Sequence, residues 1–446
     1  MSFTITELQQ RYAAHPHVEA ALRLLADSQL HHIYCGGLCA SAASLFASVV
    51  VERASSPFVF VLGDLEEAGY FYHDLVQVLG DARVLFFPSS FRRAIKYGQK
   101  DSANEILRTE VLSRLQKDGA GLCVVTYPDA LAEKVVSRRE LDDKTLKLHV
   151  GEQVDMTFVT DMLRTYGFEF VDYVYEPGQF AVRGSIIDVF SFSSEYPFRI
   201  DFFGDEVESL RTFEVETQLS KEKKDSIVIV PDLSHDLERS GTGGMVSLLD
   251  FMQPDTVLAM RDFLWLRERI QQVHDESLTP QAIAAREAEE NGNISLDGKL
   301  IDGGEFTVRA LDFRRLEFGN KPTGTPDASV QFDTSAQPIF HKNFDLVADS
   351  FHRYLSDGYT IYICSDSTKQ TDRIRAIFEE REGENLPFTA VEKTLHEGFA
   401  DNTLRLCIFT DHQLFDRFHK YNLKSDKARS GKVALSLKEL NQFQPG

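Results

Sequence analysis

The chain has 446 residues, of which 43% are hydrophobic and 26% are charged, and its formal net charge is −21. This length predicts three or four domains, and the composition is that of a globular protein, which excludes intrinsic disorder. A protein that grips DNA phosphates by itself usually carries a basic face, so the acidity favours a chain that meets a protein partner.

The sequence carries no signal for a membrane or for secretion. No run of about eighteen apolar residues occurs, and the amino terminus MSFTITELQQRY lacks a basic stretch followed by an apolar one. Cys35 and Cys39 are spaced CGGLC, without a second pair of Cys or His nearby. This spacing favours buried thiols in a reducing cytoplasm over a zinc site, and we expect no metal.

The first part of the chain alternates short apolar runs with helical spacing. Residues 6–28 predict one or two helices, and the apolar run Pro57–Leu62 is typical of a strand buried in a parallel sheet. Further predicted elements are the strands Ile33–Cys35, Arg83–Phe87 and Gly121–Thr126, and the helices Cys39–Glu52, Leu65–Leu79 and Ser102–Gln116. This order predicts a doubly wound α/β sheet.

The pattern changes at about residue 135. Over residues 144–213, strands alternate with short turns around a helix at Met156–Tyr166, and residues 214–235 lead out of this sheet-rich stretch. The α/β pattern then resumes with a strand at Thr256–Met260 and a charged helix at Asp262–Gly292. We therefore expect a small sheet-rich domain inserted into an α/β protein.

A second change lies near residue 318. Residues 318–339 are rich in Gly, Pro, Thr and Ser, which predicts a boundary loop. A compact α/β unit follows, with helices at Asn343–Leu355 and Thr368–Glu380 and strands at Thr360–Cys364 and Leu404–Thr410. The basic stretch 420–434 is typical of an exposed connector.

Turn residues divide the inserted stretch into strands. Pro177-Gly178 and Ser193–Pro197 bound the runs Gln179–Phe190 and Phe198–Phe203, which we expect to pair as antiparallel strands. Because side chains alternate along a strand, one face of the second run carries Arg199, Asp201 and Phe203. The opposite face carries Phe198, Ile200 and Phe202 and is the predicted core side.

Two readings of the outward face are open from the residues alone. An exposed aromatic flanked by arginines, here Phe203 with Arg183 and Arg199, is typical of the centre of a protein interface. Alternatively, the two arginines form surface ion pairs with nearby acids, and the residues by themselves favour this second reading. The candidate acids are Asp188, Asp201, Glu206 and Glu208. Gly184, next to Arg183, allows a bulge or a close backbone approach.

A family resemblance reverses that balance. The strings YEPGQFAVRGSIIDVF and PFRIDFFGDEVESLRTF resemble the second domain shared by the excision-repair helicase subunit UvrB and the transcription-repair coupling factors (Mfd), where it docks onto UvrA. The resemblance implies that Arg183, Arg199 and Phe203 carry the UvrA contact. This sequence has AVRG and PFR where the family has ATRG-like and PYR motifs, and both arginines are kept.

The nucleotide motifs of UvrB are incomplete. A phosphate-binding loop needs glycine N–H groups, a Lys on the phosphates and a hydroxyl on Mg²⁺. The corresponding stretch, IYCGGLCASAASLF, keeps Gly36, Gly37 and Ser41 but has no Lys. After the strand Thr256–Met260, Arg261 stands in place of the metal-binding acid and precedes Asp262. We expect a helicase-like (RecA/P-loop-like) fold whose nucleotide site is degenerate and does not turn over ATP.

The segment that corresponds to the DNA-clamping hairpin of UvrB is too short to hold one. It contains a basic and aromatic cluster, which we interpret as solvated surface and not as a DNA site: Phe91, Arg92, Arg93 and Lys96. A metal-dependent nuclease on Asp201–Glu208 is disfavoured, because strand alternation separates the acids and no His joins them. We therefore expect weak DNA binding at most.

The resemblance also implies a domain layout and a wider protein. The expected domains are 1a (25–130), 2 (131–213), 1b (1–24 with 214–335) and 3 (340–425), followed by a linker (426–446) to an RNA-polymerase-interacting domain. The chain is expected to be part of a protein more than twice as long, with ATP and Mg²⁺ bound by a downstream translocase motor and the UvrA face masked by the carboxyl-terminal part. The alternative is a DNA helicase or translocase with a nucleotide site of its own.

Overall fold

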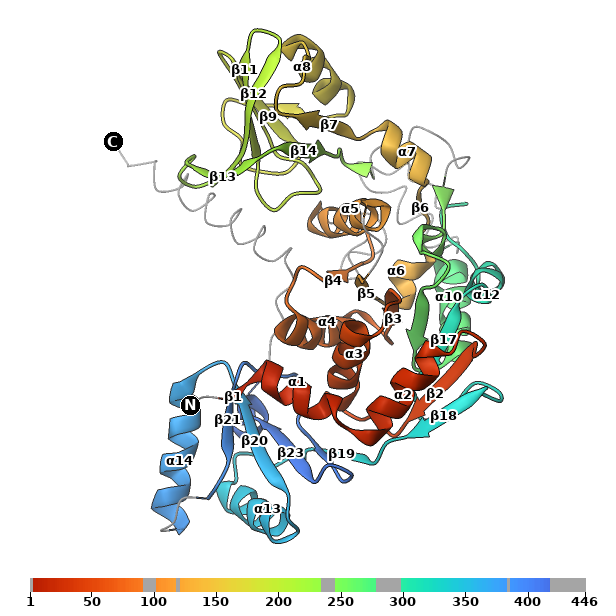
Figure 1. The fold of residues 1–446 in the computed structure, drawn as a ribbon, viewed down its shortest axis with the longest axis vertical. Helices are drawn as coiled ribbons and strands as arrows, with labels where there is room; N and C mark the ends of the chain where they lie inside the picture. The colour runs from red at the N-terminus through yellow and green to blue at the C-terminus, as the bar shows by residue number, and fades with distance from the viewer. Residues whose placement is uncertain are drawn as a thin grey trace.

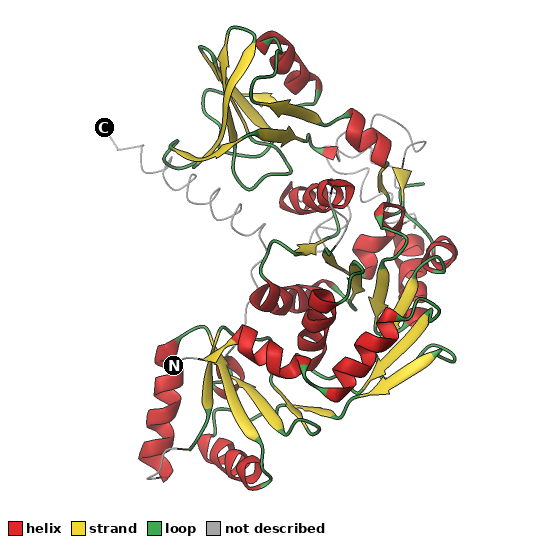
Figure 2. Cartoon of the chain, in the orientation of Figure 1, coloured by secondary structure: helices red, strands yellow, loops and turns green. Residues whose placement is uncertain are grey.

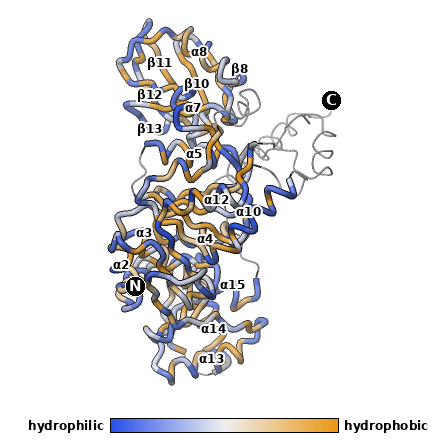
Figure 3. The backbone as a smooth tube through the Cα atoms, turned by 90° about the vertical axis from the view of Figure 1, so that its right-hand side faces the viewer, coloured by the Kyte–Doolittle hydropathy of each residue, from blue (hydrophilic) through white to orange (hydrophobic). Residues whose placement is uncertain are grey.

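The computed structural model describes residues 3–90, 102–117, 121–233, 245–277, 298–382 and 386–417. Three units, each built around a β-sheet, follow one another along the molecule, with the β-rich unit at one end (Figures 1 and 3). Helices flank the sheets of the other two units (Figure 2). This confirms the predicted multi-domain α/β architecture. Among the described residues, no helix is long and apolar enough to cross a bilayer.

The first unit, in the middle, is a seven-stranded sheet in the order β18-β2-β17-β16-β3-β5-β4, and every neighbouring pair is parallel. Its strands are β2 (His32–Gly36), β3 (Phe58–Val61), β4 (Val84–Phe86), β5 (Cys123–Thr126), β16 (Val257–Met260), β17 (Arg314–Glu317) and β18 (Ala328–Gln331). The predicted apolar runs are fully buried in it, as parallel sheets covered on both faces require. The sheet joins strands from both of the expected domains 1a and 1b.

Helices surround this sheet, and several of them begin at a residue whose side chain caps the helix. They are α1 (Ile5–Ala13), α2 (Pro16–Ala26), α3 (Ala42–Arg53), α4 (Leu65–Leu79), α5 (Ser102–Lys117), α6 (Pro128–Ala132), α10 (Phe263–Ser277) and α12 (Gly303–Ala310), with a 3₁₀ turn, η2, at Leu248–Phe251. Asp64 caps α4 by accepting from the backbone N–H groups of Glu66 and Glu67. The charged helix predicted over Asp262–Gly292 is α10 up to Ser277, and residues 278–297 lie outside the described residues.

The second, β-rich unit contains a six-stranded sheet in the order β13-β12-β11-β10-β9-β8. Its strands are β8 (Glu169–Phe170), β9 (Gln179–Arg183), β10 (Ile186–Val189), β11 (Phe198–Phe203), β12 (Glu206–Phe213) and β13 (Ser220–Lys224). Beside it lie α8 (Met156–Thr165) and the pair β7 (Leu146–His149) with β14 (Ser226–Ile229). The connecting elements α7 (Arg138–Asp143) and the pair β6 (Val135–Val136) with β15 (Met245–Val246) bury their apolar residues in the core of the first unit. The strands continue past residue 213, where domain 2 was expected to end.

One strand prediction in this unit was wrong. Gln179–Phe190 is not a single strand but the hairpin β9–β10, which turns at Gly184-Ser185 between the paired residues Arg183 and Ile186. Gly184 has φ +61°, a conformation that glycine adopts at little cost, so it serves the turn and not a bulge. The expected antiparallel partner of Phe198–Phe203 is therefore β10 alone, with Asp188 opposite Arg199.

The third unit (residues 334–417) contains a six-stranded sheet in the order β1-β21-β20-β23-β22-β19. Its elements are β19 (Thr334–Ala336), α13 (Phe344–Ser356), β20 (Thr360–Ser365), α14 (Thr368–Glu382), β21 (Thr389–Glu392), β22 (Phe399–Asp401), β23 (Leu406–Thr410) and α15 (Asp411–Leu414). Its edge strand β1 (Phe3–Thr4) comes from the amino terminus and pairs parallel with β21. Residues 318–339 are not only a loop, since β18 and β19 lie within them.

Candidate functional site

The outward face of β11 is as the alternation predicts. Phe198, Ile200 and Phe202 are buried in the core of the β-rich unit, against Val159 and Leu163 of α8. Phe203 on the opposite face is 77% exposed. A benzyl group this exposed has no packing role within the described chain, and it is available to a partner.

The two predicted arginines meet on one buried carboxylate. Asp188 on β10 is 1% exposed, and both Arg183 and Arg199 form ion pairs with it. Arg199 is bidentate: Nε lies 2.7 Å from Oδ1 of Asp188 and Nη2 lies 2.9 Å from Oδ2. These hydrogen bonds raise the pKa of Arg199. The ion-pair reading is thus realised with Asp188, while Arg183 keeps 35% and Arg199 15% of the side chain accessible.

Each guanidinium is also seated on an aromatic ring. Arg183 lies over Tyr173 at 4.9 Å from the ring centroid, and Arg199 lies over Phe213 at 4.5 Å. Arg199 Nη1 donates to the carbonyl oxygen of Gln218 at 3.2 Å. The Asp188 carboxylate and the two rings together fix the planes of both guanidinium groups, so the arginines are positioned before any partner binds.

Sequence reasoning missed the central place of Asp188, which it treated as one of four possible acidic partners. The register shows why this acid is selected: Asp188 faces Arg199 across β10–β11 and Ala181 across β9–β10. Asp201, a second candidate, is instead paired with Arg211, and Ser209 donates to it at 2.9 Å. The outer face therefore presents two arginine-carboxylate clusters with Phe203 at its end.

The loop between β2 and α3 holds the glycines of the predicted degenerate nucleotide site. A side chain on Gly37, which has φ +78°, would collide with the carbonyl oxygen of Phe332. A Cβ on Gly36 would lie 2.5 Å from the Gln331 side chain. The close approach of the chain at the end of β18 therefore accounts for Gly37, while a side chain on Gly36 would displace the Gln331 and Tyr34 side chains.

Ser41 at the start of α3 is engaged by protein groups. Its Oγ donates to Oδ2 of Asp74 on α4 at 2.6 Å and accepts from the backbone N–H of Glu397 at 2.9 Å. Ser44 Oγ donates to the same Asp74 oxygen at 2.6 Å. Burial raises the pKa of Asp74 to about 6, against the opposing effect of these hydrogen bonds.

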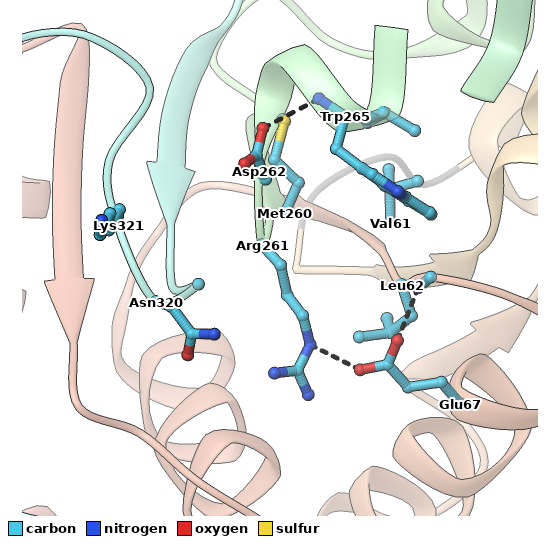
Figure 4. Close-up of a pocket in the computed structure, with 12 residues that line it drawn as sticks. Val61, Leu62, Glu67, Met260, Arg261, Asp262, Trp265, Asn320 and Lys321 are labelled. Atoms are coloured by element: carbon cyan, nitrogen blue, oxygen red, sulfur yellow. Dashed lines mark hydrogen bonds and ion pairs between the residues drawn. The ribbon is translucent and has the colours of Figure 1, made fainter. Parts of the chain in front are cut away.

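Arg261 and Asp262 lie at the carboxyl end of β16, in a cleft of ≈ 460 Å³ (Figure 4). Arg261 Nε lies 2.5 Å from Oε1 of Glu67. Asp262 Oδ1 accepts from the backbone N–H of Trp265 at 2.9 Å and so caps α10. Both side chains are therefore occupied by structural partners.

The structure brings Ser41 and Arg261 to one neighbouring cleft of ≈ 320 Å³, whereas Gly36 and Gly37 do not line it. The acidic groups around this cleft outnumber Arg261 and are Asp64, Glu66, Glu67, Asp74 and Glu397. Like charges repel, so this surround opposes binding of a polyphosphate, and the residues described around the cleft include no lysine.

Other predicted features can be placed in part. Cys35 is a buried free thiol whose pKa burial raises to about 12, and Cys39 is a half-buried free thiol. Within the described ranges, no group of three or more His, Cys, Asp and Glu side chains could hold a metal ion. The cluster Phe91, Arg92, Arg93 and Lys96, the basic stretch 420–434 and the expected linker 426–446 lie outside the described residues.

Comparison with known proteins supports the resemblance. Residues 146–235 match the family described as the UvrB interaction domain. The chain is 22% identical to the transcription-repair-coupling factor of Bacillus subtilis (strain 168) over 481 residues, covering 91% of this chain and 40% of that protein. The corresponding factor of Staphylococcus aureus (strain bovine RF122 / ET3-1) is 22% identical over 474 residues, with the same coverage. That of Escherichia coli (strain K12) is 28% identical over 198 residues, 44% of this chain and 17% of that protein.

The chain therefore spans 40% of the length of the first two relatives. The matched domain, residues 146–235, coincides with the β-rich unit and contains Arg183, Arg199 and Phe203. The family recognised from the strings around these residues is thereby supported: residues 146–235 match the UvrB interaction domain, and 91% of the chain is similar to transcription-repair-coupling factors.

Proposed function

We propose that this chain recruits UvrA to a stalled transcription complex through the outer face of its β-rich unit. The observation that carries the proposal is the exposed Phe203 beside two arginines held by Asp188 on one sheet face. Aromatic and arginine side chains dominate the energetics of protein interfaces, because they bury large areas and donate several hydrogen bonds. Preorganised arginines also lose less conformational entropy on binding.

The proposal includes a division of labour within a longer protein. This chain supplies docking without ATP turnover, which the acidic cleft and the Glu67 partner of Arg261 support. ATP and Mg²⁺ would act in a DNA translocase motor outside this chain, which displaces stalled RNA polymerase in the cytoplasm. A following domain would contact RNA polymerase, and the carboxyl-terminal part would cover the UvrA face until the motor engages.

Calorimetric titration of UvrA into the purified chain tests the docking face. Phe203→Ala should weaken binding by about 2 kcal/mol or more, roughly thirtyfold, if Phe203 is a central contact. Phe158→Ala is the matched control, since this ring is 52% exposed on α8, which packs on the opposite face of the same sheet. Equal affinities of the Phe203→Ala chain and the wild type would refute the assignment.

The autoregulatory part has a separate test. UvrA affinity of this chain is compared with that of the full-length protein in the absence of DNA and RNA polymerase. A covered face predicts tighter binding by the chain alone, because the full-length protein must first open. Equal affinities would remove the masking proposal and leave the docking proposal standing.

A further inference from the structure

The first and third units share one hydrophobic core. Buried side chains of the third unit, among them Tyr362, Leu395 and Phe399, belong to the same cluster as the sheet of the first unit. The β-rich unit has cores of its own, built around Ile200 and around Phe213. A continuous core makes two units resist relative motion, whereas a separate core leaves the β-rich unit linked mainly through its connecting strands.

The amino-terminal segment ties these two units together. Beside the pairing of β1 with β21, Arg11 donates to the hydroxyl of Tyr362, and Tyr12 packs edge-on against Phe399. His15 Nε2 lies 3.3 Å from Oδ2 of Asp401, and both side chains are fully buried. Helix α1, which carries Arg11 and Tyr12, and helix α2, which follows His15, also pack on the first unit (Figure 1).

The third unit also reaches the amino end of α3. The backbone N–H of His396 donates to Oδ1 of Asp74 at 2.7 Å, while Glu397 N–H donates to Ser41 as described above. The His396 ring stacks on Tyr70 of α4, with centroids 3.4 Å apart and planes 10° apart. Helix amino termini with exposed N–H groups and hydroxyls are the usual place for a nucleotide phosphate, and here a loop of the same chain lies there.

The loop that makes these contacts is itself held in shape. Leu395 is fully buried in the shared core. The carbonyl oxygen of His396 lies 2.7 Å from Nε2 of His412, on α15. Gly398 ends the loop where a Cβ would clash with Gln337 and with the Ile408 backbone. These contacts fix the conformation of the loop, so that its backbone N–H groups are held in place to donate to Ser41 and Asp74.

We infer that the third unit serves as an internal brace, with residues 394–397 fastened to the start of α3 where a nucleotide would be held in a working phosphate-binding loop. These contacts hold the third unit against the first unit without a bound nucleotide. The first and third units then move as one rigid body, relative to which the β-rich unit can swing. The partner of the Ser41–Asp74 surface is thus the 394–397 loop of the same chain.

Hydrogen exchange of the whole chain, read by mass spectrometry, tests the brace. Asp74→Ala removes the acceptor of one N–H and two hydroxyl groups, so amides in 394–398 and in the first turn of α3 should exchange faster together, by at least about tenfold. The milder change Ser41→Ala, which removes the acceptor of Glu397 N–H, should act in the same direction and serves if the Asp74→Ala chain does not fold.

Glu133→Ala provides the matched control. Glu133 is another buried carboxylate that accepts from two serines, Ser89 and Ser90, but all three lie within the first unit. Its removal should speed exchange near Ser89 and leave residues 394–398 unchanged. Wild-type exchange of 394–398 in both joint variants would overturn the inference, as would equal acceleration of that loop by Glu133→Ala.

UvrA titration separates this inference from the proposed function. The joint lies outside the β-rich unit, so Asp74→Ala should bind UvrA with unchanged affinity. If UvrA binding by the wild type failed, the docking proposal would fall, while the exchange result would still decide the brace.

Discussion

Removal of the Asp188 carboxylate should disable both arginines at once. In the Asp188→Ala chain, Arg199 loses a bidentate partner and Arg183 loses its ion pair, although neither arginine is itself changed. Losing one member of a buried ion pair costs about 3–5 kcal/mol, because the other charge stays behind without compensation. Here both guanidinium groups can turn to solvent, Arg183 most readily, so we expect about 2–3 kcal/mol of lost unfolding free energy.

The loss should be seen in the β-rich unit and in UvrA binding. Stability is measured by urea unfolding followed by circular dichroism. Tryptophan fluorescence is not suitable, because the single tryptophan, Trp265, lies on α10 in the first unit and not in the β-rich unit. UvrA affinity, measured by calorimetry, should fall by at least as much as in Arg199→Ala. In the double variant Asp188→Ala/Arg199→Ala, the loss of UvrA binding free energy should be smaller than the sum of the two single losses, because both substitutions act on one cluster.

Two results would refute this reasoning. Wild-type stability of the Asp188→Ala chain would mean that the carboxylate does not hold the arginines. A destabilised chain with wild-type UvrA affinity would mean that the arginine positions do not matter for docking. Asp161→Ala is the control, since Asp161 is paired with Arg164 on α8, which packs on the opposite face of the sheet.

Three further predictions concern the other sites. Because the folded-state pKa of Asp74, about 6, exceeds the ordinary value of 3.8, the folded chain holds this proton more tightly, and stability should fall as pH rises from about 4 to about 6. The contribution is at most about 3 kcal/mol, and Asp74→Asn should flatten the slope of melting temperature against pH; an identical slope would contradict the assignment. Millimolar ATP with Mg²⁺ should leave the melting temperature unchanged, whereas a concentration-dependent rise would reveal a working nucleotide site. Leu219→Ala removes a large exposed side chain next to Gln218, the carbonyl partner of Arg199, and should weaken UvrA binding less than Phe203→Ala does, as calorimetry can check.

Local patterns in the sequence determined which side chains face which way. The period of two in Phe198–Phe203 was enough to bury Ile200 and expose Phe203, because alternation follows from the pleat of any strand. Continuous apolar runs such as Phe58–Val61 were enough for buried parallel strands. The motif strings around Arg183 and Arg199 were enough to identify the family resemblance.

Tertiary structure decided which groups are partners. Asp74 and His396 are 322 residues apart in sequence, and no periodicity relates them. The choice of Asp188 over other acids depended on the register of β10, which places Asp188 opposite Arg199 of β11. The amino-terminal strand joined the third unit because that sheet offered it a parallel edge at β21. Such long-range pairings follow from the packing of whole units, so a sequence read in short windows does not contain them.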